Sequence, residues 1–159
     1  MIKTIVQTMR PSFLVLTLAC VFLGLSTSLA TGALIDKTLL TLVFIGALSA
    51  HISVNMLNEY HDFNSGLDFK TKKTPFSGGS GALPKNPKAV KLVLSIALFS
   101  LFITFAIGLY FIATVGVAIV PIGLIGLLII VTYTQWLNRI ALLCLIAPGV
   151  GLGLLMVVG

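Results

Sequence analysis

Long apolar stretches and short polar breaks alternate along the chain, and the apolar stretches dominate. Their lengths lie close to the ~20 residues that a helix needs to cross ~30 Å of hydrocarbon. The predicted spans run roughly over 12–35, 39–57, 89–111, 117–134 and 140–159. The pattern therefore predicts an all-α fold, a polytopic membrane helical bundle of about five transmembrane helices, in one membrane domain over 1–159.

The stretch 58–88 is the only long hydrophilic segment, and it separates the second predicted span from the third. It contains three prolines and the run Gly78-Gly79-Ser80-Gly81, a composition typical of loops. We expect a loop here, with at most a short helix inside it. The run could let backbone N–H groups approach an anion, or it could be a flexible turn.

Composition and charge exclude an ordinary soluble domain. Hydrophobic residues make up 58% of the chain and charged residues only 9%, against about 25% charged in soluble domains. The net charge of +6 comes from basic residues that are not interleaved with aromatic ones, so nucleic-acid binding is not expected.

Nine of the ten basic residues would lie on one side of the bilayer, with only Lys37 on the other. Under the positive-inside rule, the N-terminus and the loop are then cytoplasmic. We expect an integral protein of a prokaryotic inner or plasma membrane. The residues placed inside are Lys3, Arg10, Lys70, Lys72, Lys73, Lys85, Lys88, Lys91 and Arg139.

Oxygen-bearing side chains are concentrated where the second span ends. If its helix continues, Asn55, Asn58, Glu59 and Asp62 share an arc of roughly 100°. Asp68 follows Gly66, where the chain can turn back toward the same place. Mg²⁺ is usually held by one or two carboxylates together with substrate phosphates, so the stretch suggests a magnesium and diphosphate site. The alternative is a helix end that is polar because it meets water.

The acidic stretch also resembles a family motif. Residues 55–62 and 65–68 are similar to the first Asp-rich motif of the UbiA-type membrane prenyltransferases. The extension 74–81 resembles the branch near the 1,4-dihydroxy-2-naphthoate prenyltransferases. Further matches are Arg10-Pro11 before the first span, and Tyr133-Thr134 followed by Arg139 after the fourth.

This resemblance implies a bundle of about nine spans and Mg²⁺-dependent transfer of a prenyl group. The donor would be a prenyl diphosphate, and the acceptor an aromatic compound such as 1,4-dihydroxy-2-naphthoate, in menaquinone-type quinone biosynthesis. Asn58, Glu59, Asp62 and Asp68 would take the metal positions, with Asn58, Asp62 and Asp68 as the catalytic set. Asn55 would be an additional ligand on the diphosphate.

Two departures from the family pattern affect this interpretation. Glu59 stands where the family usually has Asp, so its carboxylate lies farther out. The family also has a second Asp-rich motif, and no acidic residue follows Asp68. We therefore expect the chain to be the N-terminal half of a longer protein, which leaves the activity of this chain alone open.

Basic side chains could contact the diphosphate. Lys72 and Lys73 follow Asp68 closely and could meet its oxygens as point charges, or they could serve only as positive-inside determinants. Arg139 could engage phosphate bidentately. The competing functions are a transporter or a non-catalytic membrane subunit with a cation site. Acids in transporters typically lie near the middle of the membrane, which favours surface chemistry here.

Overall fold

Helices make up all the regular structure in the computed structural model, which describes residues 1–70, 79–133 and 141–158. The all-α membrane bundle predicted from the apolar pattern is confirmed. The α-helices are α1 (Ile2–Thr8), α2 (Pro11–Ala30), α3 (Lys37–Asn64), α4 (Leu67–Lys70), α5 (Ala82–Lys85), α6 (Val90–Thr114), α7 (Val120–Thr132), α8 (Ala141–Pro148) and α9 (Met156–Val158). Short 3-10 turns, Pro87–Ala89 and Val117–Ile119, precede α6 and α7, and a π-helical segment, Gly149–Leu155, joins α8 to α9.

Three helical segments in the described ranges are long and apolar enough to cross a membrane. They are Pro11–Ala30, Lys37–Asn64 and Pro87–Thr114. The fourth and fifth predicted spans coincide with shorter apolar helices, Val117–Thr132 and Ile146–Leu155. The first predicted span ends earlier than expected, because α2 stops at Ala30.

Helix α3 begins at a side-chain cap and continues past the predicted span 39–57. The Asp36 carboxylate caps its start, accepting hydrogen bonds from the backbone N–H groups of Thr38 at 2.7 Å and Leu39 at 2.9 Å. The helix has 28 residues and is therefore ~42 Å long, more than the ~30 Å of the hydrocarbon core. Its last two turns, from Asn58 to Asn64, thus extend beyond the predicted span 39–57, and the loop expected at 58 begins only after Asn64.

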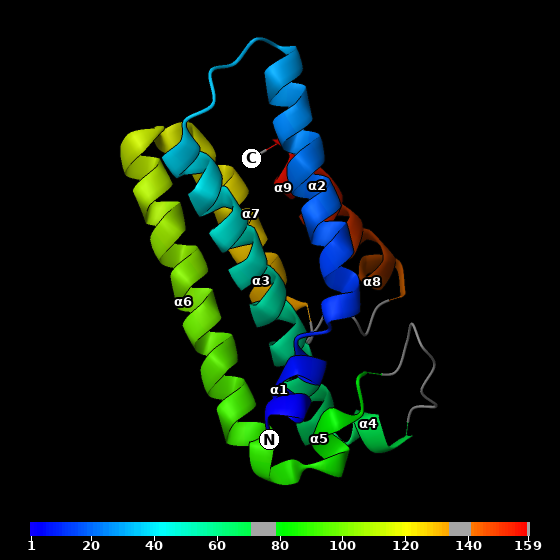
Figure 1. Ribbon diagram of the computed structural model, residues 1–159. Helices are drawn as coiled ribbons and strands as arrows, with labels where there is room; N and C mark the ends of the chain where they lie inside the picture. The colour runs from blue at the N-terminus through cyan, green and yellow to red at the C-terminus, as the bar shows by residue number, and fades with distance from the viewer. Residues whose placement is uncertain (71–78, 134–140, 159) are drawn as a thin grey trace.

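The packing centre of the molecule lies between α3 and α6, which run side by side (Figure 1). Met56 on α3 and Val93 and Ala97 on α6 have no exposed surface, and neither does Leu83 of α5. Small residues such as alanine let membrane helices approach closely. The buried cluster therefore ties the second and third predicted spans to the polar segment between them.

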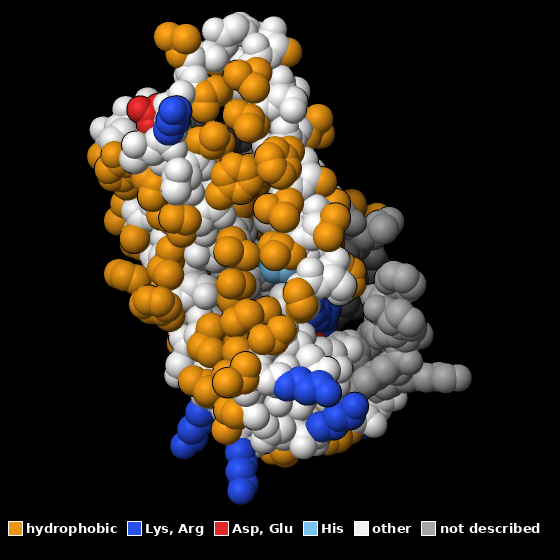
Figure 2. All heavy atoms as spheres, in the orientation of Figure 1, with side chains coloured by type: hydrophobic (Ala, Val, Ile, Leu, Met, Phe, Trp, Pro, Cys, Tyr) orange, Lys and Arg blue, Asp and Glu red, His pale blue; other side chains and the backbone are white. Residues whose placement is uncertain are grey.

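At the polar end of the molecule, α1, α4 and α5 lie around the last turns of α3 (Figure 1). The first ten residues are thus more than a polar lead, because Ile2–Thr8 is helical and packs against α5. Lys and Arg side chains gather at this end, whereas hydrophobic side chains cover the flanks of the helices (Figure 2). This distribution matches a bilayer-spanning body with one basic end.

The close approach of α3 and α6 can be tested at Ala97, which has no exposed surface. We expect Ala97→Leu to lower the free energy of unfolding by about 1–3 kcal/mol, because an extra side chain must be forced into a filled interface. The matched control is Ala106→Leu on an exposed face of the same helix. Thermal unfolding in detergent would measure both variants, and equal loss in the two would contradict this packing.

Candidate active site

Asn58 and Asp62 lie on the same face of α3, as their spacing predicts. The Asn58 side-chain Nδ2 donates a hydrogen bond of 3.0 Å to Oδ2 of Asp62, and both residues are half-buried. Asn55, one turn earlier, donates its Nδ2 to the backbone oxygen of His51 at 2.8 Å. The helix end therefore presents an amide and a carboxylate together, with a second amide directed along its own helix.

Glu59 is completely buried and has a full set of protein partners. Its Oε1 accepts hydrogen bonds from Nε of Arg10 at 3.0 Å, Nη2 of Arg10 at 2.7 Å, and the backbone N–H of Ser80 at 2.7 Å. Its Oε2 accepts one from the Ser80 hydroxyl at 2.6 Å. Both oxygens are occupied within the protein, which argues against the predicted role of Glu59 as a magnesium ligand.

Arg10 adopts an unusual backbone conformation between α1 and α2. Its φ of 51° and ψ of 63° place it in the left-handed region. Among the described residues, no other non-glycine residue has a positive φ. Pro11 disfavours right-handed helical geometry in the residue before it, and this separates α1 from α2. From the sequence, Arg10 was expected to be a cytoplasmic basic residue and part of an Arg-Pro match, and no contact with Glu59 was predicted for it. The sequence feature that could have indicated an ion pair was a single arginine directly before a predicted helix, in a chain with only four carboxylate side chains.

The glycine-rich run folds around the Glu59 carboxylate. Gly79 and Gly81 have φ of 71° and 66°, and Ser80 between them directs both its N–H and its hydroxyl at Glu59. Successive residues of this kind form anion-binding concavities. Of the two interpretations left open for this run, the described residues 79–81 support the anion cradle, and the anion is a side chain of the same protein.

Asp68 returns to the site on the short helix α4 and is buried there. Gly66, at φ 76°, makes the expected turn between α3 and α4. A Cβ atom on Gly79 would lie 2.7 Å from Oδ1 of Asp68 and 3.4 Å from Oε1 of Glu59. The backbone of the turn therefore packs directly on the two carboxylates, and only glycine leaves room for them.

The electrostatics of Asp62 show how close these acids are. Asp62 lies in the last turns of α3, after the predicted span 39–57. Burial first, and then the neighbouring Asp68 carboxylate, raise the pKa of Asp62, and with the opposing effect of Arg10 included the pKa of Asp62 is about 6. A bound cation would relieve this crowding of negative charge.

The donor set fits magnesium shared with a phosphate better than a metal held by protein alone. Among the described residues, no three His, Cys, Asp or Glu side chains gather closely enough to hold an ion. Mg²⁺ needs only one or two carboxylates when substrate phosphates complete its shell. Asp62 and Asp68 supply those carboxylates and Asn58 an amide. Lys72, Lys73 and Arg139 lie outside the described residues.

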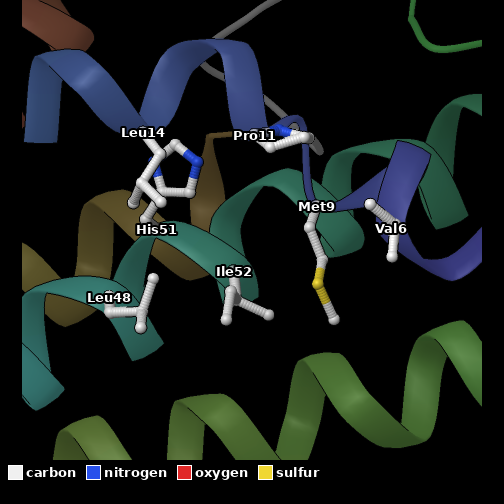
Figure 3. Close-up of a pocket in the computed structure, with 7 residues that line it drawn as sticks. All are labelled: Val6, Met9, Pro11, Leu14, Leu48, His51 and Ile52. Carbon is white, nitrogen blue, oxygen red and sulfur yellow. The ribbon is translucent and has the colours of Figure 1, made fainter.

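An apolar pocket of about 90 Å³ opens between α1, α2 and α3, on the hydrocarbon side of the acids (Figure 3). On its α3 side lies His51, whose Nδ1 is 2.9 Å from the hydroxyl of Thr17. The acidic residues are not part of its wall, so it is separate from the polar site. The pocket is lined by Val6, Met9, Pro11, Leu14, Leu48, His51 and Ile52.

The amino-acid sequence is similar to those of known proteins. A family model described as the UbiA prenyltransferase family matches residues 14–159. A 1,4-dihydroxy-2-naphthoate octaprenyltransferase of Bacillus subtilis (strain 168) is 33% identical over 100 residues, which cover 63% of this chain and 31% of the relative. The chain thus matches about a third of that protein's length. No solved structure gives a significant match.

The two acids of α3 should respond in opposite ways to neutralisation. We expect Glu59→Gln to lower the free energy of unfolding by roughly 3 kcal/mol, because it leaves the Arg10 guanidinium, 21% exposed, without its ion pair. Asp62→Asn removes a charge that burial disfavours, so it should leave stability unchanged or raise it slightly at pH 7. Thermal unfolding in detergent at pH 7 measures both. Similar losses would contradict the division of roles between the two acids.

Proposed function

The chain belongs to the UbiA prenyltransferase family, and from that premise we propose that it carries a magnesium-dependent site for a prenyl diphosphate. The observation that carries this proposal is the Asn58–Asp62 hydrogen bond in the last turns of α3, beside the buried carboxylate of Asp68, whose charge raises the pKa of Asp62. The reaction would be transfer of the prenyl group to an aromatic acceptor in quinone biosynthesis. The relative's name supports 1,4-dihydroxy-2-naphthoate as that acceptor.

The acids are suited to hold a cation against a diphosphate. The negative charge of Asp68 raises the pKa of Asp62, so the two carboxylates repel each other when both are charged. A cation bound between them would remove that repulsion. The hydrogen bond from Asn58 fixes the orientation of the Asp62 carboxylate. When bound, Mg²⁺ would neutralise the diphosphate and stabilise the charge that develops on the leaving oxygen.

The rest of the substrate would lie in hydrocarbon. Breaking the C1–O bond of the prenyl diphosphate sends its electron pair to the departing diphosphate. The allylic carbon then accepts an electron pair from a ring carbon of the acceptor, and that carbon restores the aromatic ring by releasing the group it carried, as a proton or as carbon dioxide. The prenyl tail can lie along the apolar faces of the helices, where it costs little to solvate. The apolar pocket beside α3 begins at Ile52, which lies about 9 Å along the helix from Asn58 and about 15 Å from Asp62 by the rise per residue.

The placement of charge supports chemistry at the cytoplasmic surface over transport. Asp62 and Asp68 follow the apolar part of α3, whereas transporter acids typically sit near mid-membrane. Lysine side chains gather at the same end of the molecule (Figure 2), which the positive-inside rule assigns to the cytoplasm. A diphosphate made in the cytoplasm would meet the site on that side.

The proposal predicts that the chain, purified in nanodiscs, binds radiolabelled prenyl diphosphate only when Mg²⁺ is present. Asp62→Ala should weaken binding by at least about tenfold, since a contact to a charged group contributes about 1.5–3 kcal/mol. The matched control is Asp36→Ala, which removes the carboxylate at the opposite end of α3. That variant should cost about 1 kcal/mol of stability as a lost cap, without loss of binding.

Binding that persists after chelation of divalent ions, or that Asp62→Ala leaves unchanged, would refute the assigned site. The acceptor is tested separately, by incubating the labelled donor with 1,4-dihydroxy-2-naphthoate and resolving a prenylated naphthoate. The same assay with other aromatic acids would show whether the relative's acceptor extends to this protein.

A further inference from the structure

We propose that Glu59 is a positioning residue that, held by Arg10 and Ser80, presses the Gly79 turn against Asp68 and so sets where Asp68 meets the cation. The proposal rests on the proposed function, because Asp68 and Asp62 are taken as the cation-binding pair. It gives Glu59, whose two carboxylate oxygens both accept hydrogen bonds within the protein, a role that does not require contact with substrate.

One buried carboxylate joins three segments that are far apart in the sequence. Glu59 belongs to α3, Arg10 to the junction of α1 and α2, and Ser80 to the turn before α5. Four hydrogen bonds of 2.6–3.0 Å connect them, and the carboxylate has no exposed surface. Charge-assisted bonds of this length are stronger than neutral ones, and burial removes competing water. The position of the turn is therefore determined by Glu59.

Arg10 keeps a costly backbone conformation to take part in this contact. A non-glycine residue in the left-handed region costs about 1–3 kcal/mol and persists only when the surroundings compensate it. Here Nε and Nη2 both reach the same Glu59 oxygen, a two-point contact that the single ammonium of lysine cannot reproduce. The side chain thus links the start of the first membrane span to the helix that carries the acids.

The position of the Gly79 turn in turn limits where the Asp68 carboxylate can lie. Gly79 lies so close that a Cβ atom would approach Oδ1 of Asp68 to 2.7 Å, closer than real Cβ contacts. Ser80, the next residue, is the one bonded to Glu59 through both N–H and hydroxyl. The same hydroxyl accepts a hydrogen bond of 3.1 Å from the backbone N–H of Ala82, so the start of α5 also holds the turn in place. Moving the turn therefore moves the Asp68 carboxylate.

The test compares cation affinity with fold stability in the purified chain in nanodiscs. Binding of Mn²⁺, a paramagnetic stand-in for Mg²⁺, is followed by electron paramagnetic resonance with prenyl diphosphate present to complete the metal shell, and thermal unfolding is recorded for each variant. We expect Gly79→Ala to weaken Mn²⁺ binding about 10- to 100-fold, the range typical when a residue that orients a metal ligand is lost. Ser80→Ala removes only the hydroxyl and should weaken binding several-fold.

The matched control is Gly32→Ala, in the turn between α2 and α3. Gly32 has φ 79°, close to that of Gly79, but nothing lies within 4 Å of the Cβ that it would gain. Both substitutions carry the same left-handed backbone cost, so both should lower thermal stability. Only Gly79→Ala should change Mn²⁺ affinity. Arg10→Lys should retain part of the affinity that Arg10→Ala loses.

The outcomes separate the two proposals. If the unaltered chain binds no Mn²⁺, the proposed cation site fails and the positioning role fails with it. If the unaltered chain binds Mn²⁺ and both Gly79→Ala and Ser80→Ala bind it equally well, the cation site stands and the positioning role is refuted. If Gly79→Ala does not fold, Ser80→Ala decides, because it adds no atom to the site.

Discussion

A charged carboxylate removed from water must be compensated, and that requirement organises the polar end of this protein. Glu59 is fully buried, and its charge is balanced by the Arg10 guanidinium and by hydrogen bonds from Ser80. Breaking such an arrangement by removing one partner is strongly destabilising. The N-terminal helix, the end of α3 and the glycine-rich turn therefore form one unit, although they are separated by tens of residues.

The second constraint is a mismatch between helix length and bilayer thickness. Because α3 is longer than the hydrocarbon core requires, its last turns extend beyond the predicted span 39–57. Asn58 and Asp62 occupy those turns, and Asp68 is returned to them by the turn at Gly66. The oxygen-bearing side chains Asn58 and Asp62 and the apolar pocket at His51 and Ile52 therefore lie along the same helix.

The same packing supports both the fold and the site. The fully buried apolar residues on α3, α5 and α6 lie near the polar end, whereas many large side chains along the helix flanks remain exposed for lipid. Leu83 of α5 packs in this core two residues after the turn that holds Glu59. The position of the turn is therefore secured from one side by a buried ion pair and from the other by apolar packing.

The amino-acid sequence alone determined the membrane class, the helical spans and the shared face of Asn58 and Asp62, because hydropathy and helical periodicity are local properties of the chain. It also carried the family resemblance that the comparison confirmed. It could not assign Glu59, whose spacing places it on the same arc as its neighbours. Only the tertiary structure brought Arg10, Gly79 and Ser80 to that carboxylate, since contacts across 49 and 21 residues depend on how helices pack and leave no periodic signal.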